Sequence, residues 1–433
     1  MTEVVKIVDI DQDGRGVAKI GDEVLFLHNA MLDEQVEFDI LKKKKNILFG
    51  RAITINNPSP DRVSPFCKHY NHCGGCAMQH FSEESQIEFK NKSFFHTLKN
   101  LGQVEPDEKI KPIFLEFTGY RHKARLRVKY VARKDEVLVG FNERLTHFLT
   151  DMHECKVLPE KISNLITPLR NLIRQLSIYN KLPQIEFASN QERDILIFRI
   201  LEELNESDIV LLKSFQEKNE IEVWTQSKGP ETVKPLFENI NPKVSYILRK
   251  RNLEISFNPS GFIQINPFIN ELMIEKALDL LEPKNEDIII DFFSGLGNFT
   301  LPIAQNAKNV IGIEGSEVLV ELGKLNAKNN NLKNVVFTFA DLFKIDENFY
   351  ESIKHANKWL LDPPRDGAMA LIQGMPDHIR PKRIIYVSCN AATLARDANI
   401  LTSKGYNYQS AGILNMFPNT SHIESISMFE LNE

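Results

Sequence analysis

A cysteine and two carboxylates near the C-terminus are the first candidates for chemistry. The apolar segment 383–387 leads into Cys389, and the apolar segment 358–361 leads into Asp362. Both segments have the pattern of buried parallel strands, whose carboxyl ends meet at the ligand-binding edge of a sheet. Glu424 lies in a further predicted strand close to the C-terminus. We therefore expect a thiol and two carboxyl groups at one crevice.

This set of groups suits methylation of a uracil ring at C5. Uracil C5 is a poor nucleophile until another group adds to C6, and a Cys389 thiolate could make that addition. A base must afterwards remove the C5 proton, and Glu424 is the candidate, while Asp362 could hold the base edge. Each residue alone also has a simpler interpretation, Cys389 as a small buried hydrophobe and Glu424 as a surface charge.

A methyl donor would bind beside these groups. The apolar strand at 287–292 enters a Gly295-Leu-Gly297 turn, and the next strand ends in Glu314. Glycines let the backbone approach a ligand, and an acid at the end of the next strand can accept both ribose hydroxyls. Thr300 stands where a nicotinamide fingerprint would have its third glycine. The pattern favours S-adenosylmethionine, with Glu314 on the ribose and Asp341 near the adenine.

Four of the five cysteines are spaced as metal ligands. Cys67, Cys73 and Cys76 surround the Gly74-Gly75 pair, and Cys155 follows later in the chain. Four thiolates suit a [4Fe–4S] cluster or tetrahedral zinc, and zinc ribbons usually have two CxxC pairs, whereas this chain has one. The spacing leaves both metals open, and also a loop of unligated thiols.

A row of cations indicates a nucleic-acid partner. Side chains alternate faces along a strand, so one face of the predicted strand after Gly119 is wholly cationic. Such a row can follow a phosphate backbone, although an edge strand charged against aggregation is the alternative. A second basic run in the predicted N-terminal hairpin favours a solvated loop when taken alone. The two sets are Arg121, Lys123, Arg125, Arg127 and Lys129, and Lys42, Lys43, Lys44 and Lys45.

The chain is long enough for several domains. Residues 1–55 show five short strands separated by turns, which predict a small closed barrel. Residues 56–257 contain the cysteines, a helix starting at Ser82 and a mixed strand and helix pattern. Residues 258–433 alternate strand and helix in the rhythm of a doubly wound α/β domain.

Composition excludes several classes of protein. The 433 residues are 42% hydrophobic and 26% charged, with a net charge of −5, which argues against disorder. No apolar run approaches the roughly 18 residues of a membrane helix, and the N-terminus lacks the plan of a signal peptide. Five cysteines are too few and odd in number for a secreted disulfide scaffold. We expect a cytoplasmic protein, and a monomer that does not bind membranes.

Longer motifs resemble the RNA uracil-C5 methyltransferase family. These motifs are Asp362-Pro-Pro-Arg-Asp-Gly, Ile384-Ile-Tyr-Val-Ser-Cys389-Asn-Ala-Ala-Thr393 and His422-Ile-Glu424. The cysteine pattern is similar to that of its iron–sulfur members, and the N-terminal strands resemble a TRAM domain, an OB-like RNA-binding barrel. The resemblance covers essentially the whole chain. It implies a Rossmann-like S-adenosylmethionine-dependent methyltransferase domain, an N-terminal TRAM barrel and a central α+β domain with a structural [4Fe–4S] cluster.

The resemblance also implies roles for individual residues. Cys389 becomes the nucleophile that forms the adduct at uracil C6, and Glu424 the base. Ser294 stands where many relatives have cysteine, which leaves Cys389 as the sole candidate nucleophile in these motifs. The residues implied around the cofactor and target base are Gln264, Phe293, Asn298, Glu314, Asp341 and Asp362.

The combination of barrel and cysteines resembles the members of the family that make 5-methyluridine in 23S rRNA. The member that modifies the tRNA T-loop typically lacks both, and a dual-site rRNA member shares both. Because a duplex or stacked loop hides C5 and C6, we expect the target uridine to be flipped into the crevice.

Two other functions compete with this prediction. An amino-methyltransferase acting on exocyclic nitrogens favours an aromatic residue after its Pro-Pro turn, where this chain has Arg365. An iron–sulfur RNA-binding protein with a decayed methyltransferase domain would have no need to keep Cys389 and Glu424.

Overall fold

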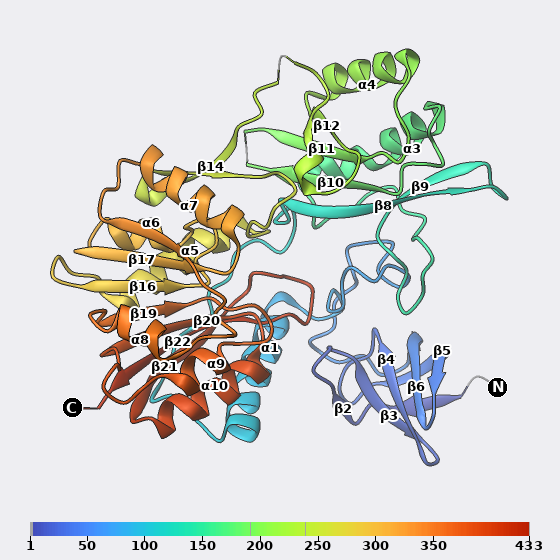
Figure 1. Cartoon of the computed structure of the whole chain (residues 1–433). Coiled ribbons are helices and arrows are strands. Elements are labelled where there is room, and N and C mark those ends of the chain that lie inside the picture. Colours follow the sequence, from blue (N-terminus) through green and yellow to red (C-terminus); the bar gives the residue numbers. More distant parts are fainter. Residues whose placement is uncertain (1–2, 191, 239, 433) are drawn as a thin grey trace.

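The computed structural model describes residues 3–190, 192–238 and 240–432. Figure 1 shows three parts: a small N-terminal barrel, a central mixed sheet and a large C-terminal sheet with helices on both faces. Within the described ranges, no helix is long and apolar enough to cross a membrane.

The N-terminal strands form a sheet that closes on itself. Its order is β1-β5-β6-β4-β3-β2, and the two end strands are consecutive in the chain. Ile7 N donates to Glu34 O and Val8 N to Val17 O, so the residues between β1 and β2 bond to both edges. The closed sheet predicted from the turn spacing is therefore present. Its strands are Val4–Lys6 (β1), Asp9–Ile10 (β2), Gly16–Ile20 (β3), Glu23–His28 (β4), Gln35–Lys44 (β5) and Ile47–Ile55 (β6).

The central sheet has the order β13-β12-β11-β10-β8-β9 and shares its core with α2, α3 and α4. Leu126 and Val128 of β8 meet Leu169 and Ile173 of α3 in one core, so the apolar face of β8 is buried as its alternation predicts. The strands are Lys123–Val131 (β8), Glu136–Gly140 (β9), Gln184–Ser189 (β10), Asp194–Arg199 (β11), Glu222–Gln226 (β12) and Lys234–Pro235 (β13). The helices are Glu160–Asn164 (α2), Ile166–Gln175 (α3) and Glu206–Asn219 (α4), and a separate hairpin follows, Val244–Leu248 (β14) and Leu253–Phe257 (β15).

The C-terminal sheet has eight strands in the order β18-β17-β16-β19-β20-β22-β21-β7. Its strands are Ile288–Phe292 (β16), Asn309–Glu314 (β17), Val335–Phe339 (β18), Lys358–Leu361 (β19), Arg383–Ser388 (β20), Tyr406–Leu414 (β21), Glu424–Leu431 (β22) and the short Glu108–Lys109 (β7). The five strands β16 to β20 are mutually parallel, and β22 runs antiparallel to β20.

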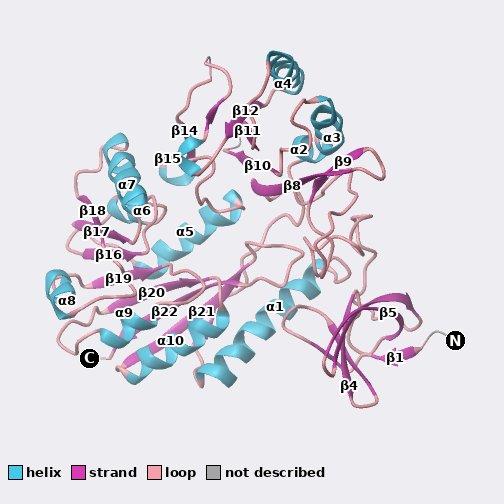
Figure 2. Ribbon diagram, turned by 45° about the vertical axis from the view of Figure 1, so that its right-hand side comes forward, coloured by secondary structure: helices cyan, strands magenta, loops and turns pink. Residues whose placement is uncertain are grey.

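Helices cover both faces of this sheet (Figure 2). Ile289 of β16 packs with α5 to α7, whereas its neighbour Ile290 packs with α8 to α10 on the other side. This alternation of buried residues produces the doubly wound arrangement. The helices are Pro267–Leu281 (α5), Thr300–Ala304 (α6), Glu317–Asn329 (α7), Glu347–Ile353 (α8), Met369–Gly374 (α9) and Ala391–Ser403 (α10).

The helix that follows the cysteines packs against the C-terminal sheet and not within the central segment. It spans Glu83–Thr97 (α1), with Ser82 as the N-cap, and continues as a π-helical turn, Leu98–Gly102. Phe94 and Leu98 share a core with Leu394 and Ala395 of α10. Strand β7 then pairs with β21 and covers that edge of the sheet. Residues 83–109, which we assigned to a central domain 56–257, thus complete the C-terminal fold.

Candidate active site

The predicted catalytic groups lie at the carboxyl edge of the C-terminal sheet. Asp362 follows β19, and Cys389 follows β20. Strand β22 runs in the opposite direction, so it begins at this same edge, and Ser388 pairs with Ser425. That register sets Glu424 beside Cys389. The structure therefore brings together the thiol and both carboxyl groups.

The charges of these groups act on one another. Burial, followed by the negative charges of Glu424 and Asp362, raises the pKa of the Cys389 thiol to about 11, and the positive charge of Arg365 opposes this rise. Glu424 is buried, and desolvation followed by the Asp362 charge holds its pKa well above the usual range. Desolvation also raises the pKa of Asp362 to about 7. The site therefore disfavours simultaneous ionisation of Cys389, Asp362 and Glu424. A cationic ligand would offset their negative charge, so the pocket suits such a ligand.

The turn after β16 forms an open cradle. Phe293, Gly295 and Gly297 all have positive φ angles, of 61°, 55° and 101°. Positive φ is uncommon for a bulky residue such as phenylalanine, and such strain gathers at ligand sites. The Phe293 ring lies 5.9 Å from that of Phe343. No atom lies within 4 Å of the place where a Cβ of Gly295 would sit, so the backbone there can approach a ligand.

Glu314, at the end of β17, fixes this cradle. Its carboxylate accepts from Gly295 N and from Ser316 N, each at 3.0 Å. Each carboxylate oxygen has a second lone pair, so both remain able to accept a ribose hydroxyl. The residues present therefore fit the nucleoside of S-adenosylmethionine.

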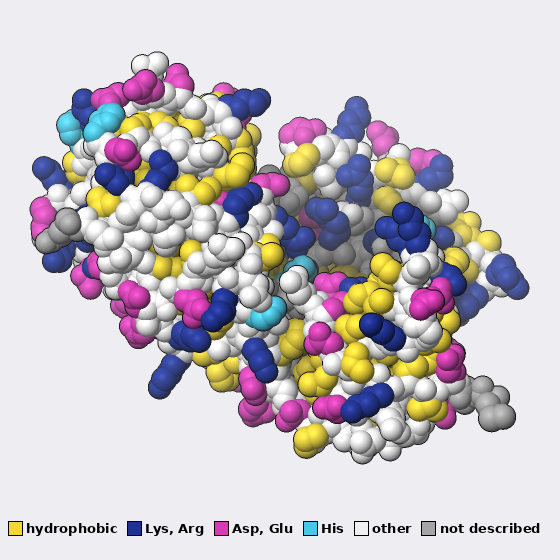
Figure 3. All heavy atoms as spheres, turned by 90° about the horizontal axis from the view of Figure 1, so that it is seen from below, with side chains coloured by type: hydrophobic (Ala, Val, Ile, Leu, Met, Phe, Trp, Pro, Cys, Tyr) yellow, Lys and Arg dark blue, Asp and Glu magenta, His cyan; other side chains and the backbone are white. Residues whose placement is uncertain are grey.

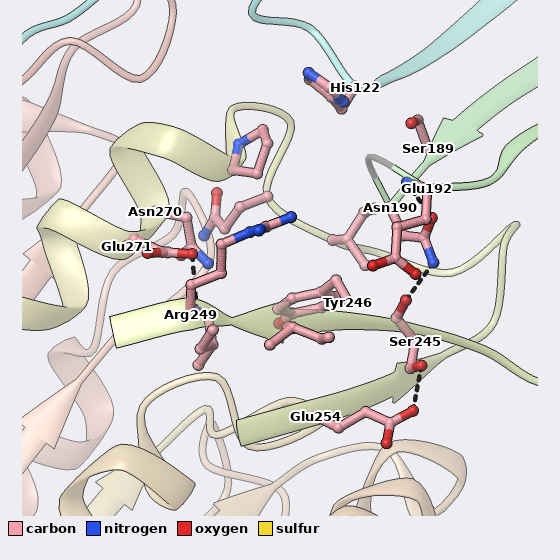
Figure 4. A pocket seen from close by; sticks show the side chains of 15 residues that line it. His122, Ser189, Asn190, Glu192, Ser245, Tyr246, Arg249, Glu254, Asn270 and Glu271 are labelled. Atoms are coloured by element: carbon pink, nitrogen blue, oxygen red, sulfur yellow. Dashed lines mark hydrogen bonds between the residues drawn. The ribbon is translucent and has the colours of Figure 1, made fainter. Parts of the chain in front are cut away.

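The other predicted cofactor residues occupy different surroundings. Asn298 exchanges hydrogen bonds with Asn270 of α5, at 2.9 and 3.0 Å, and accepts from the Tyr246 hydroxyl at 3.0 Å. Asp341 is exposed after β18, where it accepts from Phe343 N at 3.1 Å. Gln264 lines a cavity of about 190 Å³ between α5, β10 and the β14–β15 hairpin. Figure 4 shows Tyr246 and Asn270 in this cavity, facing the end of β10.

Sequence reasoning missed two supports of the site. Arg365, which we used only to weigh a rival function, is the positive group that opposes the rise in the pKa of Cys389. The backbone oxygen of Arg365 accepts from Asn390 Nδ2 and Thr393 Oγ1 at the start of α10, which ties the two motif loops together. Asp291 is fully buried and accepts from the Thr300 hydroxyl at 2.5 Å. A carboxyl inside an otherwise apolar strand was the sequence signal for it.

The four clustered cysteines line one cavity of about 410 Å³, which is also lined by Tyr120, Arg121, Arg365 and His422. Burial, followed by the charge of a neighbouring thiolate, raises the pKa of Cys76 to about 12, and burial does the same for Cys155. Among the residues that the structure describes, no three His, Cys, Asp or Glu side chains converge as ligands of one metal ion. The four thiols therefore line one cavity without converging on a single metal position, and thiols are the donor type that iron–sulfur clusters use.

Some side chains of the cationic row bind other groups of the protein, so fewer of them can contact RNA than the alternation of the strand predicts. Lys123 Nζ donates to the backbone oxygens of Pro259 and Gly261, and burial lowers the pKa of Lys123 to about 8. Arg125 pairs with Glu186 at 3.0 Å, while Lys129 is exposed. Arg121 lines the cysteine cavity.

The two basic sets lie on different parts of the molecule. The lysine run is exposed at the β5–β6 turn of the barrel, where Lys43 pairs with Glu23. The space-filling view from below shows a hollow between the C-terminal part and the barrel, with Lys and Arg side chains on its walls (Figure 3).

Comparisons with known proteins agree with this site. The profile of the family described as tRNA (Uracil-5-)-methyltransferase matches residues 85–431. Proteins of Nitrosospira multiformis and Thiobacillus denitrificans, each named 23S rRNA (uracil(1939)-C(5))-methyltransferase RlmD, are each 41% identical to this chain. Each alignment covers 99% of this chain and 99% or 100% of the relative.

A solved structure shares the fold over the whole chain. It is the tRNA (uracil-54, C5)-methyltransferase of Pyrococcus abyssi in complex with S-adenosyl-L-homocysteine. The TM-score is 0.76 at 22% identity, and the match covers 99% of this chain and 100% of that one.

Proposed function

This chain belongs to the tRNA (uracil-5-)-methyltransferase family, and from that membership we propose that it methylates C5 of one uridine in 23S rRNA with S-adenosylmethionine as donor. The 23S rRNA substrate is supported by relatives that match over their full length and bear that name. The observation that carries the chemistry is the β20–β22 register, which sets Glu424 beside Cys389.

The proposed reaction begins at Cys389. Its thiolate adds to C6 of the flipped uracil, and the electron pair of the C5–C6 bond becomes available at C5. S-adenosylmethionine supplies the electrophilic methyl group that C5 then accepts. Glu424 next removes the proton from C5, the C5–C6 double bond re-forms, and the thiolate of Cys389 leaves.

The remaining site residues bind and orient. Asp362, with its pKa near 7, holds the polar edge of the uracil ring, and Arg365 favours the thiolate form of Cys389. We propose that Glu314 binds the ribose and Asp341 the adenine. Phe293 shapes the cradle, and Asn298 and Gln264 complete the wall on the side of α5.

We further propose that Cys67, Cys73, Cys76 and Cys155 hold a [4Fe–4S] cluster. The support is their arrangement around one cavity of about 410 Å³ and the thiol-only donor set. When bound, such a cluster would tie the loop of the first three cysteines to Cys155. Iron and acid-labile sulfide in the anaerobically purified protein, and their loss in Cys76→Ser, are the expected result. Iron-free protein with intact thiols would contradict it.

RNA would be held outside the crevice. The closed N-terminal sheet supports a TRAM-type barrel at residues 1–55 with Lys42, Lys43, Lys44 and Lys45 at its RNA-facing turn. On β8 we assign RNA contacts to Arg125, Arg127 and Lys129. We assign a smaller share to Lys123 and to Arg121, which precedes β8, because their surroundings leave them less accessible to RNA. With ribosomal RNA as the proposed substrate, we also propose that the protein works in the cytoplasm.

The test uses methyl-labelled S-adenosylmethionine, the anaerobically purified protein and unmodified total RNA separated by size. We expect label in 23S rRNA, as 5-methyluridine. Label in tRNA would retain the chemistry and replace the substrate with the one named for the Pyrococcus abyssi enzyme. Label in neither RNA, with the protein folded, would refute the proposed activity.

The activity should rise with pH through the neutral range. Burial and neighbouring negative charges raise the pKa of the Cys389 thiol to about 11 in the free protein, so the thiolate that begins the reaction is gained as the pH rises. We expect log(kcat/KM) to increase with a slope of about +1 between roughly pH 7 and 9. Arg365→Gln should move the rise to higher pH because it removes the cation that favours the thiolate. A flat profile in both proteins would show that no such deprotonation limits the reaction.

A further inference from the structure

The connection between β21 and β22, residues 415–423, is buried to an unusual degree. Asn415, Met416, Pro418, Asn419 and Thr420 are all buried. Loops normally run over the surface because their backbone groups need water. This β21–β22 loop ends at Glu424, so whatever holds it also determines where that carboxyl group lies.

Asn419 is the most heavily bonded residue of the loop. Its backbone oxygen accepts from Ala77 N at 2.8 Å and from Met78 N at 3.0 Å. Its backbone N–H donates to Gln86 Oε1 at 2.9 Å, and its Nδ2 donates to Phe117 O at 2.6 Å. It is 1% exposed and has a φ of +63°, a conformation that asparagine tolerates better than most residues. The backbone and side chain of this one residue thus join three segments that are distant in sequence.

Two of these bonds come from the segment that contains the cysteines. Ala77 and Met78 follow Cys76 directly, and residues 67–78 are called the cysteine loop below. The Tyr120 hydroxyl donates to Pro418 O at 2.8 Å, and Tyr120 also lines the cysteine cavity. Phe417, Thr420 and His422 line the same cavity from the other side.

Helix α1 holds the start of the β21–β22 loop. Lys90 is buried, and its Nζ donates to Asn415 Oδ1 at 2.8 Å and to Phe417 O at 2.9 Å. The loop is therefore fixed at both its beginning and its centre. Glu424 follows Asn419 by only five positions, and its strand partner on β21 is Leu414.

We propose that Asn419 is a positioning residue that couples the cysteine loop to Glu424. The inference rests on the proposed role of Glu424 as the base. A change at the cysteine loop would move Ala77 and Met78. Because both bond to the Asn419 backbone, it would also move the β21–β22 loop, which leads directly into Glu424. Displacing a catalytic group by about 1 Å can cost roughly 100-fold in rate.

The experiment compares Asn419→Ala with the matched control Asn331→Ala. Asn331 also has a positive φ, of 57°, but lies exposed between α7 and β18. Both variants place alanine at a positive φ and so have the same unfavourable backbone conformation. Only Asn419→Ala also removes hydrogen bonds from the β21–β22 loop. We expect Asn419→Ala to lower kcat about 10- to 100-fold with the KM for RNA changed less than about twofold. The uncleaved protein–RNA adduct should accumulate on denaturing gels, because proton removal at C5 is the impaired step.

The variant Asn419→Gly tests whether a loss of activity in Asn419→Ala results only from unfolding of the protein. Glycine keeps the positive φ and the bonds that the Asn419 backbone makes to Ala77, Met78 and Gln86, while losing the side-chain bonds to Phe117 O and from Gln86 Nε2. We expect an intermediate kcat and less adduct than in Asn419→Ala. Wild-type kcat in Asn419→Ala, or a lower kcat without adduct, would overturn the positioning role.

Amide hydrogen exchange tests the coupling without any activity. In Asn419→Ala, exchange should quicken about tenfold or more both at residues 415–424 and at residues 76–78. Unchanged exchange at 76–78 would overturn the coupling. A wild-type protein that transfers no methyl group, with coupled exchange, would instead refute the proposed function and keep the structural inference.

Discussion

Replacing Cys389 by alanine should lower methyl transfer at least about 10⁴-fold while leaving RNA binding intact. Among the described residues at this edge of the sheet, the thiol is the group suited to add to uracil C6, because a carboxylate is a much weaker nucleophile toward carbon than a thiolate. Cys389 is partly buried and its side chain carries little of the core, so the fold should survive its removal. Single-turnover transfer and filter binding of the same RNA measure the two quantities.

The matched control is Ser294→Ala. Ser294 is buried in the neighbouring turn after β16, and the change removes one Oγ just as Cys389→Ala removes one Sγ. We expect a small effect on kcat. Transfer that persists in Cys389→Ala would exclude the covalent mechanism, and equal losses in both variants would indicate general damage to the crevice.

Glu424→Gln should trap the methylated RNA on the protein. The amide has the shape of the carboxyl group but cannot accept the C5 proton, so the reaction should stop after methyl transfer and before the thiolate leaves. We expect kcat to fall roughly 10²- to 10⁴-fold, with a covalent species that is resistant to denaturant and carries the methyl label. Gel electrophoresis with label in either the RNA or the methyl group identifies it.

Glu430→Gln is the control on the same strand. Glu430 lies six residues further along β22, about 20 Å away at strand spacing, where it pairs with Arg383. We expect Glu430→Gln to have an unchanged kcat and to accumulate no covalent adduct. Adduct that is unlabelled in the methyl group would instead place the block before methyl transfer and remove Glu424 from the proton step.

The placement of Asp362 and Cys389 at one edge of the sheet could be predicted because strand ends can be located from local sequence patterns. Apolar runs followed by polar motifs placed Asp362 and Cys389 at one edge, and β19 and β20 have nearly the predicted bounds. The pairing of Glu424 with that edge depended on the direction of β22, which alternation alone does not determine.

Other features depend on contacts between distant segments and so escaped local reasoning. Lys123 has the correct position on the charged face of β8, but its long side chain reaches the carbonyls of Pro259 and Gly261. The burial of the β21–β22 loop has no local signature either. Its polar sequence suggests a surface turn, and only the convergence of the cysteine loop and α1 supplies its hydrogen bonds.

The docking of residues 83–109 on the C-terminal sheet has a consequence for biosynthesis. Helix α1 and strand β7 leave the ribosome about 300 residues before their partner β21 does. Until then Phe94 and Leu98 have no α10 to pack against, and β7 has no strand to pair with. The sheet can therefore be completed only after β21 and β22 have been synthesised, and no mRNA truncated before residue 406 encodes a finished catalytic edge. Assembly of this site is thereby made conditional on synthesis of segments about 300 residues apart.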